Sequence, residues 1–354
     1  MNNIERLTNA LLEQEYEAIL IKDQTNRLFA TDFESGDGML LVTRSGAWFF
    51  TDSRYIEAAE IAITNANVQL ITNELPYSAR INAVLSDYGI RSLGFEEDSV
   101  TYSEYHSLQD KLEANLIPAQ KLLREMRLIK SADDLEKMKK SQRIAEKSFE
   151  EILPFINTDI TEKELAAELL YRFLKNGADD KSFSTIVVSG PKSSMPHGVP
   201  GDIKIGKGFL TIDFGVRLDG WCSDTTRTLC LGQPNEEMIR IYNTVLEAQI
   251  AGIRTAHAGA ACRAVDAEAR AVIDKAGYGE FFGHGFGHGV GLEVHEAPRA
   301  SKSSDDILPS GAVISAEPGI YLPGRYGVRI EDVLYITENG CENITDLPKK
   351  LLVI

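Results

Sequence analysis

The segment FLTIDFGVRLDGWCSDTTRTLCL, residues 209–231, consists of two β-rich runs on either side of a short polar turn. Its aspartates Asp213 and Asp224 lie 11 positions apart. A two-residue loop at Leu218–Asp219 would set the two carboxylates directly opposite each other, with Cβ atoms about 5 Å apart. A loop at Asp219–Gly220 would instead make them near neighbours offset by two positions. In either register, two like charges this close destabilise the sheet unless a cation lies between them.

A second hairpin pattern, AVISAEPGIYLPGRYGVRIEDVLYI, covers residues 312–336. Glu317 and Glu331 are 14 positions apart about Gly324, so a three-residue loop there would make them cross-strand partners. With one neutral imidazole, the two carboxylate pairs form a five-ligand set whose negative charge two divalent cations would neutralise. The sequence therefore predicts a dinuclear metal centre.

The residue types also limit the choice of metal. Carboxylates mixed with imidazole suit manganese, cobalt, iron or zinc, whereas calcium prefers oxygen ligands alone and a structural zinc site prefers thiolates. Manganese or cobalt is favoured by ligand hardness. Two such ions lower the pKa of a shared water and polarise a carbonyl, so the predicted reaction class is hydrolysis.

The glycine-rich stretch GHGFGHGVGLEVHEAP, residues 283–298, carries three of the six histidines of the chain. In an extended strand His284, Phe286 and His288 share one face, and the glycines leave the other face free for close packing. His295 has the opposite parity, so a strand that turned it toward the same site would have to bend or bulge. One histidine can then bind metal while the others remain free for proton transfer.

The composition excludes several classes of function. The chain has 354 residues, 43% of them hydrophobic, and a formal net charge of −16, which argues against nucleic acid or anionic lipid as a partner. We expect no membrane span, because no apolar run approaches about 18 residues. We expect no export signal, because the first twenty residues carry acids early and lack a basic start followed by an apolar run and a cleavage site. The four cysteines form no disulfide or metal-knuckle pattern, so we expect a cytoplasmic protein.

The chain reads as two domains, residues 1–122 and 123–354. The first alternates β-rich runs with helical patterns, which is typical of an α/β domain, and predicts a hairpin through residues 44–46. The second opens with a long amphipathic helix behind a capping box at residues 131–134, and another box at residues 161–164 opens the next helix. Strands and hairpins follow, interleaved with a helix from about residue 236 to residue 257.

Together these motifs resemble the pita-bread family of metal-dependent peptidases, which includes prolidases, aminopeptidases P and methionine aminopeptidases. The resemblance rests on SMPHGVP, DFGVRLDGWCSDTTRT, GHGFGHGVGLEVHEAP, AEPGIY and GVRIEDV, which occur in the family's order and spacing. It implies a pita-bread α+β catalytic domain over residues 123–354. The segment MLLVTRSGAWFFTDSRYIEAA, residues 39–59, resembles the creatinase-type α/β amino-terminal domain shared by prolidases, aminopeptidases P and creatinases.

The resemblance also implies a role for each site residue. Asp224 and Glu331 would bridge the two ions, and Glu317 would shuttle a proton for a hydroxide bridging them. His197 and His295 would contact the substrate near the scissile bond, and His284 and Arg329 match positions beside the ligands. The implied metal ligands are Asp213, Asp224, His288, Glu317 and Glu331.

The implied activity is hydrolysis of the bond between an amino-terminal residue and proline. We favour an Xaa-Pro dipeptidase, with aminopeptidase P activity on longer Xaa-Pro peptides as the alternative and a catalytically silent scaffold as the alternative from another class. The expected cofactor is two divalent ions, Mn²⁺ first and Co²⁺ or Zn²⁺ next. The expected partners are a proline-containing peptide and a second copy of the chain in a homodimer. A dinuclear phosphoesterase lacks support, because no arginine cluster or phosphate-binding glycine loop accompanies the carboxylates.

Overall fold

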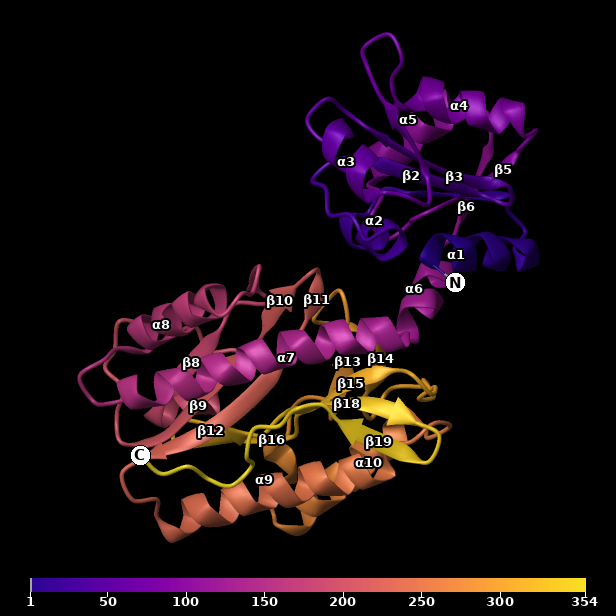
Figure 1. Ribbon diagram of the computed structural model, residues 1–354. Helices are drawn as coiled ribbons and strands as arrows, with labels where there is room; N and C mark the ends of the chain where they lie inside the picture. The colour runs from indigo at the N-terminus through magenta and orange to yellow at the C-terminus, as the bar shows by residue number, and fades with distance from the viewer. Residues whose placement is uncertain (1) are drawn as a thin grey trace. The chain divides into compact units, whose positions relative to one another are not determined.

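The computed structural model describes residues 2–354, which form two compact units, one ending at Arg127 and one running from Leu128 to Ile354 (Figure 1). The sequence placed the boundary before Leu123, a position that lies inside helix α6 (Gln120–Leu128). Among the described residues, no helix is both long and apolar enough to span a bilayer.

The first unit is built on a six-stranded sheet with the order β4-β3-β2-β1-β5-β6. Strand β2 pairs antiparallel with β1 and β3, and the other pairings are parallel. The predicted hairpin is confirmed, because Thr43 pairs with Gly46 across the turn between β2 and β3. The strands are β1 (Ala18–Ile21), β2 (Met39–Thr43), β3 (Gly46–Thr51), β4 (Asn67–Leu70), β5 (Ser92–Phe95) and β6 (Asn115–Pro118). The helices before α6 are α1 (Asn3–Ala10), α2 (Gln24–Thr31), α3 (Ile56–Ala62), α4 (Tyr77–Asp87) and α5 (Tyr102–Lys111).

The second unit has the mixed helix and strand content expected of a pita-bread domain. Its sheets have the orders β12-β9-β8, β11-β10-β7, β14-β13-β15-β18-β19 and β16-β17. The first strands are β7 (Asp180–Lys181), β8 (Ile186–Ser189), β9 (Gly208–Phe214), β10 (Val216–Leu218), β11 (Trp221–Cys222) and β12 (Thr225–Leu231). The later strands are β13 (Gly287–Gly289), β14 (Glu296–Ala300), β15 (Val313–Ala316), β16 (Gly319–Leu322), β17 (Tyr326–Arg329), β18 (Asp332–Thr337) and β19 (Gly340–Asn343).

Four long helices pack on these strands, and Figure 1 shows β8, β9 and β12 lying between α8 and α9. The helices are α7 (Ala132–Ile152), α8 (Glu162–Lys175), α9 (Glu236–Thr255) and α10 (Cys262–Lys275). Both predicted capping boxes are present, with Ser131 capping α7 and Thr161 capping α8. The apolar stripe of α7 is buried against α8 and the β8-β9-β12 sheet, so this helix pair forms one core of the unit.

The hairpin of residues 209–231 adopts the second of the two registers considered for the sequence. Leu218 pairs with Trp221, so the loop is Asp219–Gly220, and Asp213 faces Thr226 rather than Asp224. Both loop residues have positive φ, 51° and 82°, which is the conformation that a two-residue turn of this kind requires. An aspartate followed by glycine reaches it at low cost, and the turn therefore fixes the register.

The second hairpin has the predicted register. Gly319 pairs with Arg329 in the β16–β17 ladder, and Ala316 pairs with Asp332 in the β15–β18 ladder. The loop between β16 and β17 is three residues long and centres on Gly324, which has a φ of 71°. Glu317 and Glu331 fall opposite each other in the short break between these two ladders.

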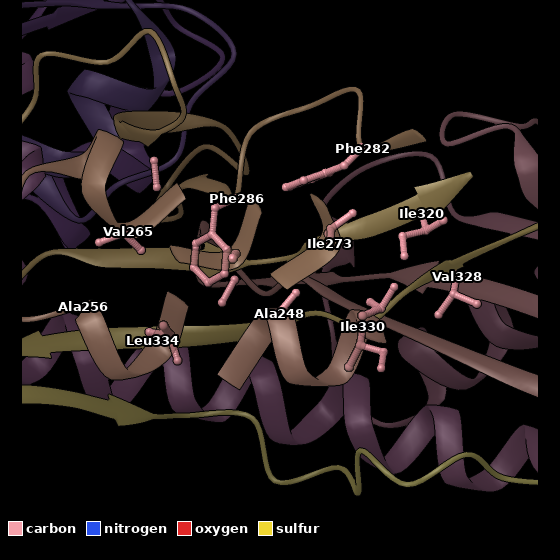
Figure 2. Close-up of a cluster of buried hydrophobic side chains, with 14 of the residues drawn as sticks. Ala248, Ala256, Val265, Ile273, Phe282, Phe286, Ile320, Val328, Ile330 and Leu334 are labelled. Atoms are coloured by element: carbon pink, nitrogen blue, oxygen red, sulfur yellow. The ribbon is translucent and has the colours of Figure 1, made fainter. Parts of the chain in front are cut away.

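The glycine-rich stretch differs from the expected continuous strand. Only Gly287–Gly289 and, from Glu296 onward, β14 are extended, so His284, Phe286 and His288 do not lie along one strand face. Phe286 is fully buried in the core formed by α9, α10 and the strands beside them (Figure 2). A Cβ on Gly287 would lie 2.0 Å from the carbonyl oxygen of Ser315, so glycine allows β13 to pack directly on β15. The expected irregularity is present, because the pairing of β13 with β14 shifts register after His288.

Phe286 should be a major source of stability for the second unit. Its ring is fully buried and packs on Gly252, where a Cβ would lie only 2.3 Å away, so removing the ring would leave a cavity. We expect Phe286→Ala to lower the free energy of unfolding by about 3–5 kcal/mol, measured by calorimetry or chemical denaturation. Leu174→Ala, on an exposed face of α8, is the control and should change it by less than about 0.5 kcal/mol. Equal effects of the two substitutions would contradict this description of the core.

Candidate active site

The second unit contains a cavity of about 530 Å³, a size typical of small-ligand pockets. Every site residue selected from the sequence lies on its wall. These residues are His197, Asp213, Asp224, His284, His288, His295, Glu317, Arg329 and Glu331.

Three of these side chains form a tight group of possible metal ligands. One donor atom each from Asp224, His288 and Glu331 lies within 4.8 Å of the others. The Nε2 atom of His288 lies 3.6 Å from Oδ2 of Asp224 and 3.1 Å from Oε1 of Glu317. The three residues come from different parts of the chain, and the hairpins and strand β13 bring them together.

Arg329 joins the remaining carboxylate to the wall of the cavity. Its Nη2 donates to Oδ2 of Asp213 at 2.6 Å, and its Nε donates to Oγ1 of Thr226 at 3.0 Å. Its Nη1 donates to the hydroxyl of Tyr321 at 2.9 Å and to the carbonyl oxygen of Pro196 at 3.2 Å. A nearly buried guanidinium with four such acceptors is held rigidly, so it can fix the position of Asp213.

The carboxylates of the cavity repel one another. Burial raises the pKa of Asp224 well above its ordinary value, and the neighbouring charge of Glu331 raises it further. Burial likewise raises the pKa of Glu331 well above its ordinary value, with the charge of Glu317 adding to the shift. The pKa of Asp213 is also raised, chiefly by burial and against the opposing charge of Arg329. Arg329 therefore does not supply enough positive charge to stabilise all of these carboxylates in their charged forms, and additional cations would do so.

The imidazoles respond to the same surroundings. Burial would lower the pKa of His288, but the hydrogen bond and charge of Glu317 outweigh burial and raise it. Loss of solvent would raise the pKa of Glu317, but the hydrogen bond and charge of His288 outweigh it and lower the pKa to about 2. Burial lowers the pKa of His284 by more than the charge of Glu317 raises it, and burial also lowers the pKa of His295.

The donor set fits divalent cations. Oδ1 of Asp213 is buried without a hydrogen-bond partner, which is costly for a carboxylate oxygen unless another group binds it. Carboxylate oxygens with one imidazole nitrogen are a suitable donor set for manganese, cobalt, iron or zinc. Asp213, Asp224, His288, Glu317 and Glu331 are thus the residues that could hold metal ions in this cavity.

The sequence did not identify three other residues of the site. Tyr321 lies between two predicted residues, because its hydroxyl is 2.9 Å from Nε2 of His284 and accepts from Arg329. Thr226 donates to Oε2 of Glu331 at 2.6 Å, and its place opposite Asp213 follows from the hairpin register. Arg299 lines the cavity as an exposed cation. Tyr321 lies within the motif AEPGIY, so its neighbourhood was visible in the sequence although its contact was not.

Comparison with known proteins agrees with this geometry. Residues 136–338 match the model of metallopeptidase family M24, and residues 3–129 match the creatinase/prolidase N-terminal domain. A protein named Xaa-Pro dipeptidase from Pyrococcus horikoshii is 37% identical over 91% of this chain and 96% of its own length.

Solved structures give the same result over nearly the whole chain. An Xaa-Pro dipeptidase from Bacillus anthracis superposes with a TM-score of 0.95 at 40% identity, covering 99% of each chain. An X-Pro aminopeptidase from Thermotoga maritima superposes with a TM-score of 0.93 at 34% identity, covering 100% of each chain.

Divalent ions should stabilise the folded chain, because they would relieve the repulsion among the carboxylates of the cavity. At a free-ion concentration 100 times the dissociation constant, the expected gain in unfolding free energy is about 2.7 kcal/mol. Thermal unfolding with a chelator and after readdition of manganese measures this gain. An unfolding midpoint that no divalent ion shifts would contradict the assignment of the cavity as a metal site.

Proposed function

The chain belongs to metallopeptidase family M24, and from this membership and the geometry of its cavity we propose that it acts as an Xaa-Pro dipeptidase. It would hydrolyse the peptide bond between an amino-terminal residue and a following proline. The observation that supports this most directly is the cavity itself, which gathers four carboxylates and three further histidines around His288. A metallopeptidase needs such a cluster to bind metal beside groups that transfer protons.

Five residues would hold the metal. We propose that two divalent ions bind there, with Asp224 and Glu331 bridging them. The close grouping of donors from Asp224, His288 and Glu331 supports this, as does the unpaired buried oxygen of Asp213. When bound, the ions would lower the pKa of a water molecule and polarise the scissile carbonyl. The proposed ligands are Asp213, Asp224, His288, Glu317 and Glu331.

The chain's own side chains would move the protons. The proline nitrogen leaves only if it is protonated, so a group that carries a proton to it is required. We assign this role to Glu317, which would take the proton released by the attacking water and pass it to the proline nitrogen. Its Oε1 accepts a hydrogen bond from the hydroxyl of Ser315 at 3.2 Å and is thereby oriented. His197 and His295 would contact the substrate near the scissile bond, and both have exposed rings on the cavity wall.

A dipeptidase must recognise the free carboxylate of the proline residue, whereas an aminopeptidase must let the chain continue. Arg299 supports the dipeptidase, because its guanidinium lies on the cavity wall close enough to His295 to influence the ring's pKa. The names of the dipeptidase relatives support the same choice. The similarity to the Thermotoga maritima aminopeptidase keeps activity on longer Xaa-Pro peptides as the second candidate.

Three finer expectations remain predictions. These are manganese as the metal, a homodimer as the assembly and the cytoplasm as the location. Metal analysis of protein purified without added ions tests the first, and light scattering in solution tests the second. A catalytically silent scaffold remains the alternative from another class, and the complete set of carboxylate and histidine donors argues against it.

Rates on Ala-Pro and on Ala-Pro-Ala-Ala with manganese should separate the two peptidase candidates. We expect cleavage of the dipeptide to dominate, and we expect Arg299→Met to raise KM for Ala-Pro at least tenfold while changing any cleavage of the tetrapeptide by less than twofold. A preference for the tetrapeptide would identify the aminopeptidase. No cleavage of either peptide by metal-loaded protein would contradict proline specificity.

Asp224→Asn tests the proposed bridging ligand. The amide has nearly the volume of the carboxylate but lacks its charge, so we expect turnover to fall at least a hundredfold and metal content to fall, with the fold retained. Metal content by mass spectrometry and circular dichroism measure the two effects. Asp305→Asn, at a highly exposed aspartate, is the matched control. Full activity of Asp224→Asn would show that the bridging role is misassigned.

A further inference from the structure

We propose that Glu162 is a positioning residue that clamps both ends of the segment carrying His197, residues 190–200. This inference rests on the proposed function, in which His197 contacts the substrate. Glu162 is the first residue of α8, is fully buried and does not line the cavity, so it would act only through the segment it holds.

Each oxygen of the Glu162 carboxylate accepts two hydrogen bonds from residues in or next to the segment. Oε1 accepts from the backbone N–H of Ser189 at 2.8 Å and from its hydroxyl at 3.2 Å, directly before the segment begins. Oε2 accepts from Nζ of Lys192 at 2.6 Å and from the backbone N–H of Gly201 at 3.1 Å, directly after the segment ends. One side chain thus joins two chain positions 12 residues apart.

The start of α8 strengthens this clamp. The backbone N–H groups of Glu162 and Lys163 donate to the carbonyl oxygens of Ile203 and Gly201, both at 3.1 Å. These N–H groups have no partner within their own helix, so the chain after the segment supplies one. Glu162 therefore holds Ser189 and Gly201 against the same helix end.

His197 depends on its backbone for its position. His197 is exposed, and among residues 2–354 no group forms a hydrogen bond with its ring. The ring sits in a turn closed by the N–H of Gly198 donating to the carbonyl oxygen of Met195 at 3.0 Å. The position of this turn over the cavity is set by the ends of the segment and by two bonds from β17. The N–H of Gly327 donates to the hydroxyl of Ser193 at 2.9 Å, and Arg329 donates to the carbonyl oxygen of Pro196.

The clamp can be broken without touching the cavity. In Glu162→Gln one oxygen becomes an NH₂ group, and on either side of the carboxylate it would face N–H donors. A buried NH₂ group that faces other N–H groups is unfavourable, so the hydrogen bonds at one end of the segment, either at Ser189 or at Gly201, would be lost. Glu164→Gln is the matched control. This substitution removes the same charge from the same helical turn, but Glu164 forms these hydrogen bonds only with Thr161.

A double-mutant cycle with His197→Ala tests the proposal, using Ala-Pro hydrolysis by the metal-loaded full chain. We expect Glu162→Gln to lower kcat at least tenfold in the native background and less than twofold in the His197→Ala background, with unchanged metal content. Glu164→Gln should change kcat less than twofold in both. Equal losses in the two backgrounds would overturn the proposal, because they would indicate a general structural role.

Lys192→Met provides a milder variant if Glu162→Gln does not fold, since it removes one of the four donors. We expect a threefold or greater loss of kcat that again disappears in the His197→Ala background. A loss that persists in that background would overturn the proposal.

Hydrogen exchange supplies a readout independent of activity. Weakening the clamp through Glu162→Gln or Lys192→Met should speed exchange of the amides in residues 189–201, tenfold or more for the former, and leave strands β9 and β12 unchanged. Unchanged exchange in this segment would overturn the clamp even if activity fell. If the native chain cleaved no proline peptide, the proposed function would fail, whereas the exchange result would still decide whether Glu162 holds the segment.

Discussion

The structure of the catalytic unit depends on one electrostatic constraint, namely that several carboxylates share a space with little solvent. Asp213, Asp224 and Glu331 are buried, and burial, together with repulsion from neighbouring carboxylates that include Glu317, raises their pKa values. Arg329 offsets part of this charge through its ion pair with Asp213. Such a cluster is stable only if the scaffold is rigid and further positive charge is available, which is the condition that a metal site of this family fulfils.

The strands make the backbone around the cavity rigid, and the breaks between strands set the direction in which the carboxylate side chains point. Asp224 lies in the gap between β11 and β12, Glu317 in the gap between β15 and β16, and Glu331 in the gap between β17 and β18. A regular ladder alternates its side chains between two faces, so it could not turn these groups toward one point without such interruptions. Two hairpins interrupted in this way carry carboxylates from distant parts of the chain to a common cavity.

The parts around the cluster serve different purposes. The glycines of the GHGFGHG stretch let β13 approach β15 closely, and Phe286 anchors the stretch in the core. The backbone that carries His288 is therefore held on both sides. By contrast, His197 has an exposed ring on a turn. Its position depends on hydrogen bonds made elsewhere in its segment, chiefly those from the backbone N–H groups of Ser189 and Gly201 to the Glu162 carboxylate. Rigidly held carboxylates beside a separately fixed histidine are consistent with the proposal that metal and peptide bind in one cavity.

The sequence by itself determined the α/β character of the first unit, the capped helices and the register of the second hairpin, because these follow from local patterns of apolar residues, caps and turns. The α+β class of the second unit came from the resemblance of its motifs to a known family. Residue types and spacing selected the four carboxylates and the histidines of the glycine-rich stretch, and the family resemblance added His197 and Arg329. The fold gathers all nine residues on one cavity wall. Only the tertiary structure decided that Asp213 faces Thr226, that Tyr321 links His284 to Arg329 and that Glu162 clamps the His197 segment. These contacts depend on turn geometry or on side chains from separate elements, and neither leaves a periodic signal in the sequence.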